Sequence, residues 1–348
     1  MERLTDREKE ILAHLQTNPM ITQDELASRF NISRSSAAVH ISNLMRKKAI
    51  LGRGYVFNER TSVVILGEIY SWIDGQVKDA IEVISQPAVA GSIDQEWGGS
   101  GLLIAERLAA MKVPVLLLST LGLDEESEQV LGQLRRAGID TRYIVRSNSY
   151  RTPRVIRVAR QQEEKSVIEI HDLEGLSLVS SELVQQRENL FEGAQAAFVS
   201  SCLPAETINQ CLNIARGREL ALFIAATVNI QPLKEVSSFD GLDYLIIDSF
   251  RLAELTHMRV AGEDGILRGA EFMRARGVSN IVVVDSQEGV FLFFADDSIR
   301  LPRLPGQDLL SRGLIHELTA GLIYGAINGY SIRQSARIGM RAIAGLRK

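Results

Sequence analysis

The sequence predicts an α/β protein with two parts. A short helical domain ending in a β wing precedes a doubly wound, mostly parallel sheet with a small β lid. Three observations lead to this fold class. The chain of 348 residues suits one small and one large domain. Residues 1–60 contain short helical patterns followed by one hairpin pattern, whereas from Ser62 onward buried-strand runs alternate with amphipathic helical segments. We therefore expect domains at residues 1–60 and 61–348.

The composition fits a globular protein of the cytoplasm. Hydrophobic residues make up 45% of the chain and charged residues 24%, which allows an ordinary core. The two cysteines, Cys202 and Cys211, have no metal-ligand residues nearby, so we expect inert core thiols in a reducing compartment. The N-terminus lacks the apolar segment of a signal peptide, and no apolar run approaches the roughly 18 residues of a membrane span. We expect no membrane partner.

Charge is distributed unevenly along the chain. Residues 1–60 hold ten Lys/Arg and seven Asp/Glu, whereas the remainder holds 29 and 36. A basic segment on an acidic body suggests that the segment meets a polyanion. Ordinary solvated helices reach a similar net charge, so this imbalance alone is weak evidence for a polyanionic partner.

Two capping boxes open the first two helices. Thr5 stands three residues before Glu8, and Thr22 stands three residues before Glu25. In each pair the hydroxyl can cap the start of a helix, and the glutamate can accept from the backbone N–H of the threonine. Apolar residues at helical spacing follow each box, and Pro19 ends the first helix.

A third helix is expected from Arg34 to about Lys47, capped by Ser33. Its apolar stripe is predicted to contain Val39, Ile41 and Leu44. Residues 50–57 then alternate around two glycines, which is typical of a β-hairpin.

The order helix, helix, tight turn, helix, hairpin resembles the MarR-like winged helix-turn-helix regulators. The resemblance implies that the start of the third helix enters the major groove of double-stranded DNA. The side chains expected at base edges or phosphates are Arg34, Ser35, Ser36 and His40, and those expected at backbone phosphates are Arg46, Lys47, Lys48 and Arg53. The alternative is a protein-docking module of three helices and a hairpin. The capping boxes, the basic run at 46–48 and the Gly-Arg-Gly wing favour DNA.

The larger domain carries the pattern of a covered parallel sheet. Its apolar runs, each expected to form a buried strand, lie at residues 63–67, 113–118, 221–224, 244–247 and 280–284. Two further regions, about 69–96 and 152–170, alternate as exposed antiparallel strands do, most clearly at 154–159. We expect these strands to form a lid over the ligand edge of the sheet.

Several motifs of this domain occur in the order found in the PfkB (ribokinase-like) carbohydrate kinases. Gly98 and Gly99 precede a helix, residues 118–124 match a G-x-D turn, and residues 134–141 are close to the usual family wording. Residues 313–325 resemble the family's second signature, a glycine-led turn that runs into a small-residue helix. The resemblance covers residues 63 to about 345. It implies a ribokinase-like fold and, if active, phosphoryl transfer from ATP with Mg²⁺.

The residues that the family uses for catalysis are replaced here. The G-A-G-D turn, which supplies the anion hole and the catalytic aspartate, reads Gly313, Leu314, Ile315 and His316. The N-x-x-E motif falls on Ser249 and Leu252, with Glu254 on a different face if the segment is helical, and T-x-G reads Val284, Asp285 and Ser286. Phosphoryl transfer depends mostly on positioning and charge stabilisation, so these losses remove most of the catalysis. An imidazole can act as a base, but the β-branched Ile315 is expected to resist the positive φ of an anion-binding nest.

The resemblance also locates a ligand pocket at Trp72, Asp74, Gly98, Gly99 and Leu103. The family's sugar-binding aspartate and asparagine fall on Trp72 and Leu103, so this pocket is expected to be more apolar than that of a kinase. Trp72 could fill the pocket or stack on a ligand ring. The five histidines show no metal-ligand spacing, so we expect no metal site and no bound cofactor.

We interpret the chain as a DNA-binding transcriptional regulator whose PfkB-like domain is a catalytically impaired pseudokinase. That domain is expected to act as a ligand sensor, a dimerisation scaffold or both, so the expected partners are double-stranded DNA, a small-molecule effector and a second copy of the chain. Two alternatives stay open. One is an active PfkB-family sugar or nucleoside kinase with a fused DNA-binding domain, and the other is a large domain that only pairs subunits.

Overall fold

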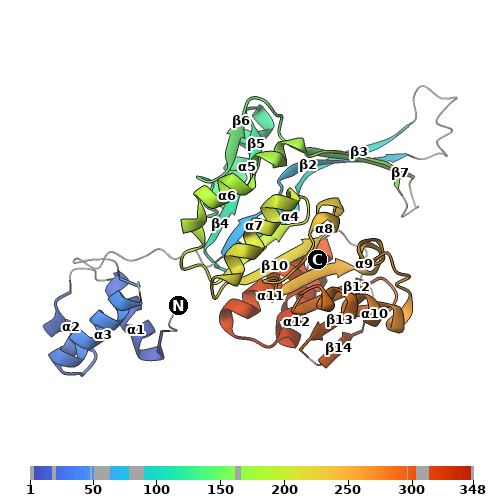
Figure 1. The fold of residues 1–348 in the computed structure, drawn as a ribbon. Coiled ribbons are helices and arrows are strands. Elements are labelled where there is room, and N and C mark those ends of the chain that lie inside the picture. The colour runs from blue at the N-terminus through green and yellow to red at the C-terminus, as the bar shows by residue number, and fades with distance from the viewer. Residues whose placement is uncertain are drawn as a thin grey trace. The chain divides into compact units, whose positions relative to one another are not determined.

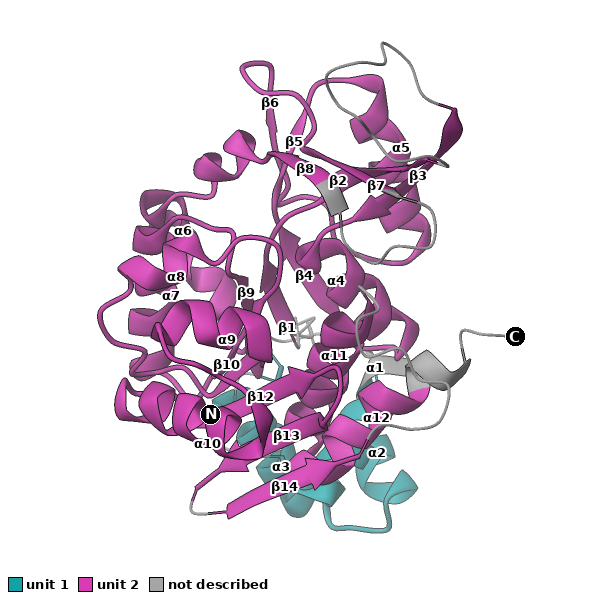
Figure 2. Ribbon diagram, turned by 90° about the vertical axis from the view of Figure 1, so that its right-hand side faces the viewer, with its two compact units in different colours: residues 1–60 teal, residues 61–348 magenta. Residues whose placement is uncertain are grey.

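The structure is a computed structural model that divides into two compact units, residues 1–60 and 61–348, coloured teal and magenta in Figure 2. It describes residues 4–17, 21–47, 49–50, 63–77, 90–160, 166–295, 297–302 and 313–345. The predicted hairpin with Arg53, and Lys48, lie outside the described residues. Each unit is described by itself below.

The smaller unit contains α1 (Asp6–Thr17), α2 (Gln23–Arg29) and α3 (Arg34–Arg46). Both predicted capping boxes form. The backbone N–H of Thr5 donates to the carboxylate of Glu8 at 2.7 Å, and the N–H of Thr22 donates to that of Glu25 at 2.9 Å. Ser33 caps α3 as predicted, because its Oγ accepts from the N–H of Ser36 at 3.1 Å.

The buried stripe of α3 differs from the prediction in one residue. Ala37, Ile41 and Leu44 are buried, but Val39 is 57% exposed, so its assignment to the core was wrong. Residues two apart lie about 200° apart around a helix. Val39 is two residues from both Ala37 and Ile41, and the helix therefore turns it to the opposite face.

The main sheet of the larger unit has the strand order β14-β13-β12-β11-β10-β9-β1-β4. Its parallel strands are β1 (Val63–Leu66), β4 (Val115–Leu118), β9 (Ala196–Ser200), β10 (Ala221–Ala226), β11 (Tyr244–Asp248) and β12 (Asn280–Asp285). The antiparallel strands β13 (Gly289–Phe294) and β14 (Asp297–Leu301) complete one edge. The predicted mostly parallel sheet is confirmed.

Helices cover both faces of this sheet. Val63 and Ile65 of β1 pack with α4 (Ser100–Ala110), α5 (Glu125–Arg136), α11 (Gly313–Asn328) and α12 (Ile332–Gly345). Val64 and Leu66 pack on the other face with α6 (Ser181–Gln186), α7 (Ala205–Arg216), α8 (Gln231–Glu235), α9 (Ser249–Thr256) and α10 (Gly262–Ala275). Two short 3₁₀ helices, Glu174–Leu178 and Glu188–Phe191, flank α6. In the described part of the chain, no helix combines the length and apolarity needed to cross a membrane.

A second sheet forms the predicted lid. It comprises β2 (Tyr70–Val77), β3 (Gly91–Gly98), β7 (Arg154–Arg160) and β8 (Ser166–Asp172) in the order β3-β2-β7-β8. Its outer pairs are antiparallel as expected, but its central pair, β2 with β7, is parallel. Figure 1 shows this sheet extending away from the helices of the larger unit. A small parallel pair, β5 (Thr120–Gly122) and β6 (Val145–Ser147), comes between β3 and β7 in the sequence.

Helices α11 and α12 cross with their backbones in contact. A Cβ atom on Gly321 would lie 2.4 Å from the backbone nitrogen of Gly339, and one on Gly339 would lie 2.4 Å from the carbonyl oxygen of Glu317. Neither position can hold a larger residue unless a helix moves. The position of α12 therefore fixes that of α11.

Candidate functional site

The candidate site lies at the carboxyl ends of the parallel strands, where ligands bind in sheets of this kind. Gly99 immediately precedes α4 with a φ of 109°, and a Cβ there would lie 2.2 Å from the carbonyl oxygen of Glu68. Only glycine therefore allows the chain to enter α4 beside the end of β1. The predicted Gly98–Gly99 motif is thus required for this close approach.

Four polar side chains converge at this point and are named here the His316 cluster: Glu68, Ser100, Thr227 and His316. Nε2 of His316 lies 3.1 Å from Oγ of Ser100, which lies 2.9 Å from Oγ1 of Thr227. Oε1 of Glu68 accepts from the backbone N–H of Ser100 at 2.8 Å. His316 is only 8% exposed. The side chain at the position predicted for a catalytic base is therefore held in a buried polar cluster.

The first turn of α11 carries the glycine-led motif. Gly313, Leu314, Ile315 and His316 form a regular helix start, and Ile315 does not adopt a positive φ. This backbone agrees with the expectation that a β-branched residue resists the positive φ of an anion-binding nest. The first four N–H groups of any helix lack intrahelical partners, whatever their side chains. The position predicted for the catalytic aspartate holds His316 in this turn.

The predicted pocket residues separate into two groups. Trp72 is 4% exposed and packs with Tyr70 and Val155, which fits the interpretation that it fills the pocket. Asp74 is held on the lid sheet, where it accepts from Nη1 of Arg157 at 3.1 Å and from Nε2 of Gln76 at 2.7 Å. Leu103 is half-buried on α4.

The positions predicted to match N-x-x-E and T-x-G hold a buried leucine and an aspartate. Leu252 is fully buried in α9, whereas Glu254 lies on a different face of that helix and pairs with Lys234 at 2.8 Å. Ser249 donates through Oγ to the carboxylate of Asp285 at 2.6 Å. Burial acts to raise the pKa of Asp285, but hydrogen bonds from Ser249 and two backbone N–H groups lower it below the ordinary value. An ionised carboxylate there repels nucleotide phosphates.

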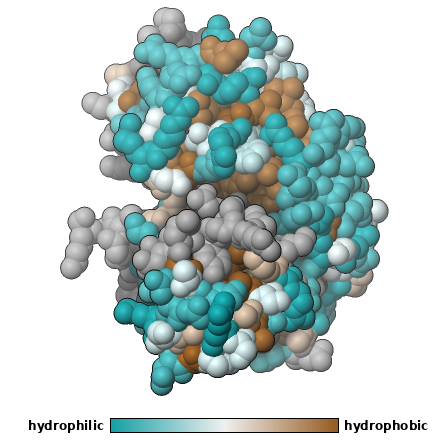
Figure 3. Space-filling view, turned by 90° about the vertical axis from the view of Figure 1, so that its left-hand side faces the viewer, coloured by the Kyte–Doolittle hydropathy of each residue, from teal (hydrophilic) through white to brown (hydrophobic). Residues whose placement is uncertain are grey.

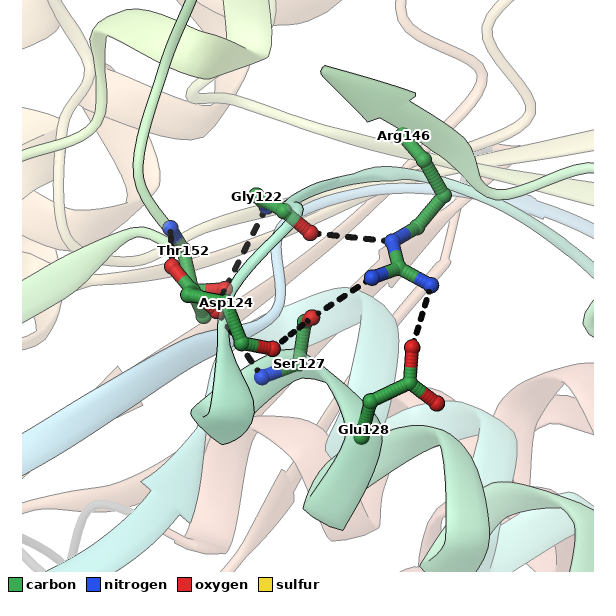
Figure 4. A network of polar contacts seen from close by, with 6 residues as sticks. All are labelled: Gly122, Asp124, Ser127, Glu128, Arg146 and Thr152. Atoms are coloured by element: carbon green, nitrogen blue, oxygen red, sulfur yellow. Dashed lines mark hydrogen bonds and ion pairs between the residues drawn. The ribbon is translucent and has the colours of Figure 1, made fainter. Parts of the chain in front are cut away.

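The G-x-D turn contains a network of hydrogen bonds centred on Asp124. Figure 4 shows the Asp124 network: Gly122, Asp124, Ser127, Glu128, Arg146 and Thr152. Asp124 caps α5 through the N–H of Ser127 at 3.0 Å and accepts from the N–H and Oγ1 of Thr152, at 2.8 and 2.5 Å. Burial acts to raise the pKa of Asp124, but the bonds from Thr152 and Ser127 lower it. The network ties the approach to β7 onto the start of α5.

In the smaller unit, Lys47 is turned inward. Its Nζ lies 2.7 Å from the carboxylate of Glu8, and the two side chains are 8% and 3% exposed. The hydrogen bond from Lys47 lowers the pKa of Glu8 against the opposing effect of burial. Contrary to the sequence-based expectation of a phosphate contact, the structure places Lys47 in a bond between the end of α3 and the start of α1.

The exposed side of α3 differs partly from the predicted one. Its central residues are named here the outer row: Ser35, Val39, Ser42 and Arg46, all exposed. Ser36 and Arg34 are also exposed, and Arg34 pairs with Asp24 of α2 at 3.3 Å. His40 is half-buried at the flank, and its Nδ1 has no hydrogen-bond partner among the described residues. Sequence reasoning missed Val39 and Ser42, which a projection from Ala37, Ile41 and Leu44 identifies.

The two cysteines of the larger unit are buried. Burial raises the pKa of the thiols of Cys202 and Cys211, as expected for inert core residues. Over the residues that the structure describes, no three His, Cys, Asp or Glu side chains are grouped so that they could hold a metal ion.

The surface seen in Figure 3 is mostly hydrophilic, with hydrophobic patches among the polar side chains.

Two family models match the sequence, one for each unit. The model for winged helix-turn-helix DNA-binding matches residues 4–50, and that for pfkB family carbohydrate kinase matches residues 60–311. A relative from Escherichia coli, named Uncharacterized sugar kinase YeiI, is 29% identical over 342 residues, or 98% of this chain and 93% of that protein. Bifunctional protein HldE of Trichlorobacter lovleyi is 23% identical over 248 residues, 70% of this chain and 50% of that protein.

Solved structures share the fold of the larger unit. Ribokinase from Arabidopsis thaliana, complexed with ribose and ATP, has a TM-score of 0.71 at 16% identity, covering 82% of this chain and 91% of its own. A carbohydrate kinase from Agrobacterium tumefaciens has a TM-score of 0.66 at 22% identity, covering 81% and 89%. At these identities the likeness is one of fold, and the site must decide the function.

Proposed function

Because the chain belongs to the pfkB family of carbohydrate kinases and carries a winged helix-turn-helix domain, we propose that it is a DNA-binding transcriptional regulator. In this proposal the kinase-like unit has lost phosphoryl transfer and serves as a ligand sensor, a dimerisation scaffold or both. The proposal concerns the use of the fold, since the family itself includes active kinases.

One observation carries the loss of phosphoryl transfer. The family's catalytic base is an aspartate that must face the acceptor hydroxyl, and here the position holds His316. A catalytic base needs access to that hydroxyl. The imidazole of His316, however, is 8% exposed and lies within hydrogen-bond distance of Ser100. A buried imidazole within hydrogen-bond distance of a protein hydroxyl supports the proposal that this position no longer serves an acceptor hydroxyl.

The nucleotide side supports the same conclusion. Leu252 places a buried aliphatic side chain where the family has the glutamate that organises Mg²⁺. Asp285 adds a negative charge where the family has a neutral T-x-G turn, and its lowered pKa keeps it ionised at neutral pH. Both changes disfavour Mg-ATP, because the first removes a ligand for the metal and the second repels the phosphates.

A phosphotransfer assay tests this loss. The full-length protein is incubated with Mg-ATP and a panel of sugars and nucleosides, with an active ribokinase as positive control. We expect no turnover above background. Turnover near the usual kinase range of about 1 s⁻¹ or faster, abolished by His316→Ala, would contradict the proposal. That result would favour the second candidate, an active sugar or nucleoside kinase, to which the name of the Escherichia coli relative points.

Salt-dependent DNA binding tests the regulatory role. We expect full-length protein to bind duplex DNA with an affinity that falls as salt rises. Arg46→Ala should weaken binding to all sequences and reduce the salt slope by about 1, as for the loss of one phosphate contact. Lys48→Ala tests the same role beyond the described residues. Lys47→Met is the matched contrast, because it should unpair the buried Glu8 and destabilise the smaller unit by about 3 kcal/mol.

The lid sheet offers a surface for dimerisation. Ile73 and Ile156 are paired in register, as are Ile156 and Ile170, so they share one face of the sheet. On that face Ile93 is 77% exposed and Ile170 is 53% exposed. An apolar face of this kind is typical of an interaction surface, and we assign it to a second copy of the chain. Ile170→Lys should shift the sedimentation coefficient from dimer to monomer, whereas Leu267→Lys on α10 should not.

A further inference from the structure

The exposed valine of α3 has a defined polar setting. Val39 lies in the outer row, with Ser35 one turn before it and Ser42 and Arg46 after it. The helix contains no acidic residue. At its start, the hydroxyls of Ser35 and Ser36 lie 2.8 and 2.9 Å from Oγ of Ser33. The exposed isopropyl group of Val39 therefore lies among hydroxyl and basic side chains on this helix.

Such a face fits nucleic acid better than protein. Met45 is the other exposed large hydrophobic residue on the described part of α3, at 38%, so the apolar area is small. The core of a protein interface is built from larger aromatic and aliphatic side chains. A major groove instead presents phosphates at its edges and, at each thymine, one apolar methyl group among the hydrogen-bonding atoms of the bases.

We infer that Val39 contacts a thymine methyl group in the major groove and makes the protein prefer A·T over G·C at that base pair. The inference rests on the proposed DNA-binding function and adds a specificity-determining residue to it. The isopropyl group and the C5-methyl group exclude water from each other, which is the physical source of the preference. The small serines on either side allow the helix to approach the base edges closely.

Replacement of thymine by uracil tests this inference directly. The full-length protein is first used to select duplexes from a random-sequence library. The enriched duplex is then synthesised again with each thymine in turn replaced by uracil, which removes the methyl group and keeps the base pairing. We expect uracil at one position of each half-site to weaken binding about fourfold, as for the loss of one buried methyl group.

The variant Val39→Ala identifies the side chain responsible. It should bind the thymine duplex more weakly than the wild type and should lose the response to uracil at that one position only. Ser42→Ala, a truncation of a neighbouring exposed residue, should keep the response. Circular dichroism should show both variants folded, because neither side chain is in the core.

The possible failures are distinguishable. If the protein binds selected duplexes but uracil weakens binding at no position, or if Val39→Ala keeps the full response, the inference about Val39 is overturned and DNA binding stands. If no sequence is enriched and no salt-dependent affinity is found, the proposed function fails together with the inference.

Discussion

The Asp124 network and the His316 cluster both stand at motifs of the pfkB family, yet they differ in how fully their polar atoms are matched. Both carboxylate oxygens of Asp124 accept hydrogen bonds, from Ser127 and Thr152. Near His316, Oε2 of Glu68 is buried without a hydrogen-bond partner among the described residues, and so is Oε2 of Glu317. The carboxylate of Asp124 is thus fully hydrogen-bonded, whereas each of the two carboxylates near His316 keeps one oxygen without such a bond in the described part of the chain.

This difference separates structural from chemical roles within one family scaffold. Asp124 caps a helix and anchors the approach to β7, so the fold needs it whether or not the protein transfers phosphate. The side chain of His316 instead lies in the His316 cluster, where its Nε2 is 3.1 Å from Oγ of Ser100. If phosphoryl transfer has been lost as proposed, a residue needed only for chemistry is free to change, and His316 at the predicted aspartate position agrees with that proposal.

The largest effect is expected for Asp124→Ala. The substitution removes the cap of α5 and leaves the N–H and hydroxyl of Thr152 without their acceptor. We expect a loss of about 2–4 kcal/mol in the free energy of unfolding. Both tryptophans, Trp72 and Trp97, belong to the larger unit, so their fluorescence during urea unfolding reports on this unit alone. A loss below about 0.5 kcal/mol, the usual range for a neutral surface change, would remove the basis of the comparison.

Thr152→Val sharpens the comparison within the network. It removes the hydroxyl that donates to Asp124 and accepts from the N–H of Gly122, while keeping the shape of the side chain. We expect a cost of about 1–2 kcal/mol. Measured alone and together with Asp124→Ala, it should show non-additive costs, because the two residues share a hydrogen bond. Additive costs would mean that the network does not act as a unit.

His316→Ala should cost less than either change. Ser100 and Thr227 share a hydrogen bond of 2.9 Å, which can persist when the imidazole of His316 is removed. We expect a loss of about 1 kcal/mol, measured by the same fluorescence method. A loss greater than that of Asp124→Ala would break the comparison, since His316 would then be the structural residue of the two.

The smallest effect concerns pH. An unfolded aspartate has a pKa of about 3.9, and that of Asp124 is lower in the folded protein. Its contribution to stability is therefore complete above about pH 4 and is lost as the pH falls through the folded pKa. Asp124→Asn cannot titrate, so the stability difference between wild type and variant should shrink below pH 4. A difference that stays constant down to pH 3 would assign the effect of Asp124 to packing instead of charge.

The fold was largely predictable because its signals are local. Continuous apolar runs such as residues 63–66 mark buried parallel strands, and the hydroxyl–glutamate spacing at Thr22 and Glu25 marks a helix start. The lid strands were found by their alternation, but the parallel pairing of β2 with β7 was not. Pairing between strands far apart in sequence depends on contacts that no local pattern contains.

The candidate sites were less predictable because they depend on where long side chains point. The basic run at residues 46–48 suggested three phosphate contacts, yet Lys47 turns inward to Glu8, which lies 39 residues earlier. The clustering of Ser100, Thr227 and His316 joins positions up to 216 residues apart, and only the folded chain shows it.

The glycine crossing of α11 and α12 makes the last helix a mechanical part of the site. Because the two backbones touch at Gly321 and Gly339, there is no side-chain layer to absorb a displacement between them. A ligand, a partner or a fused segment that pulls on α12 therefore displaces α11 and, with it, the turn that carries His316. A displacement of α12 is thus expected to move His316 as well.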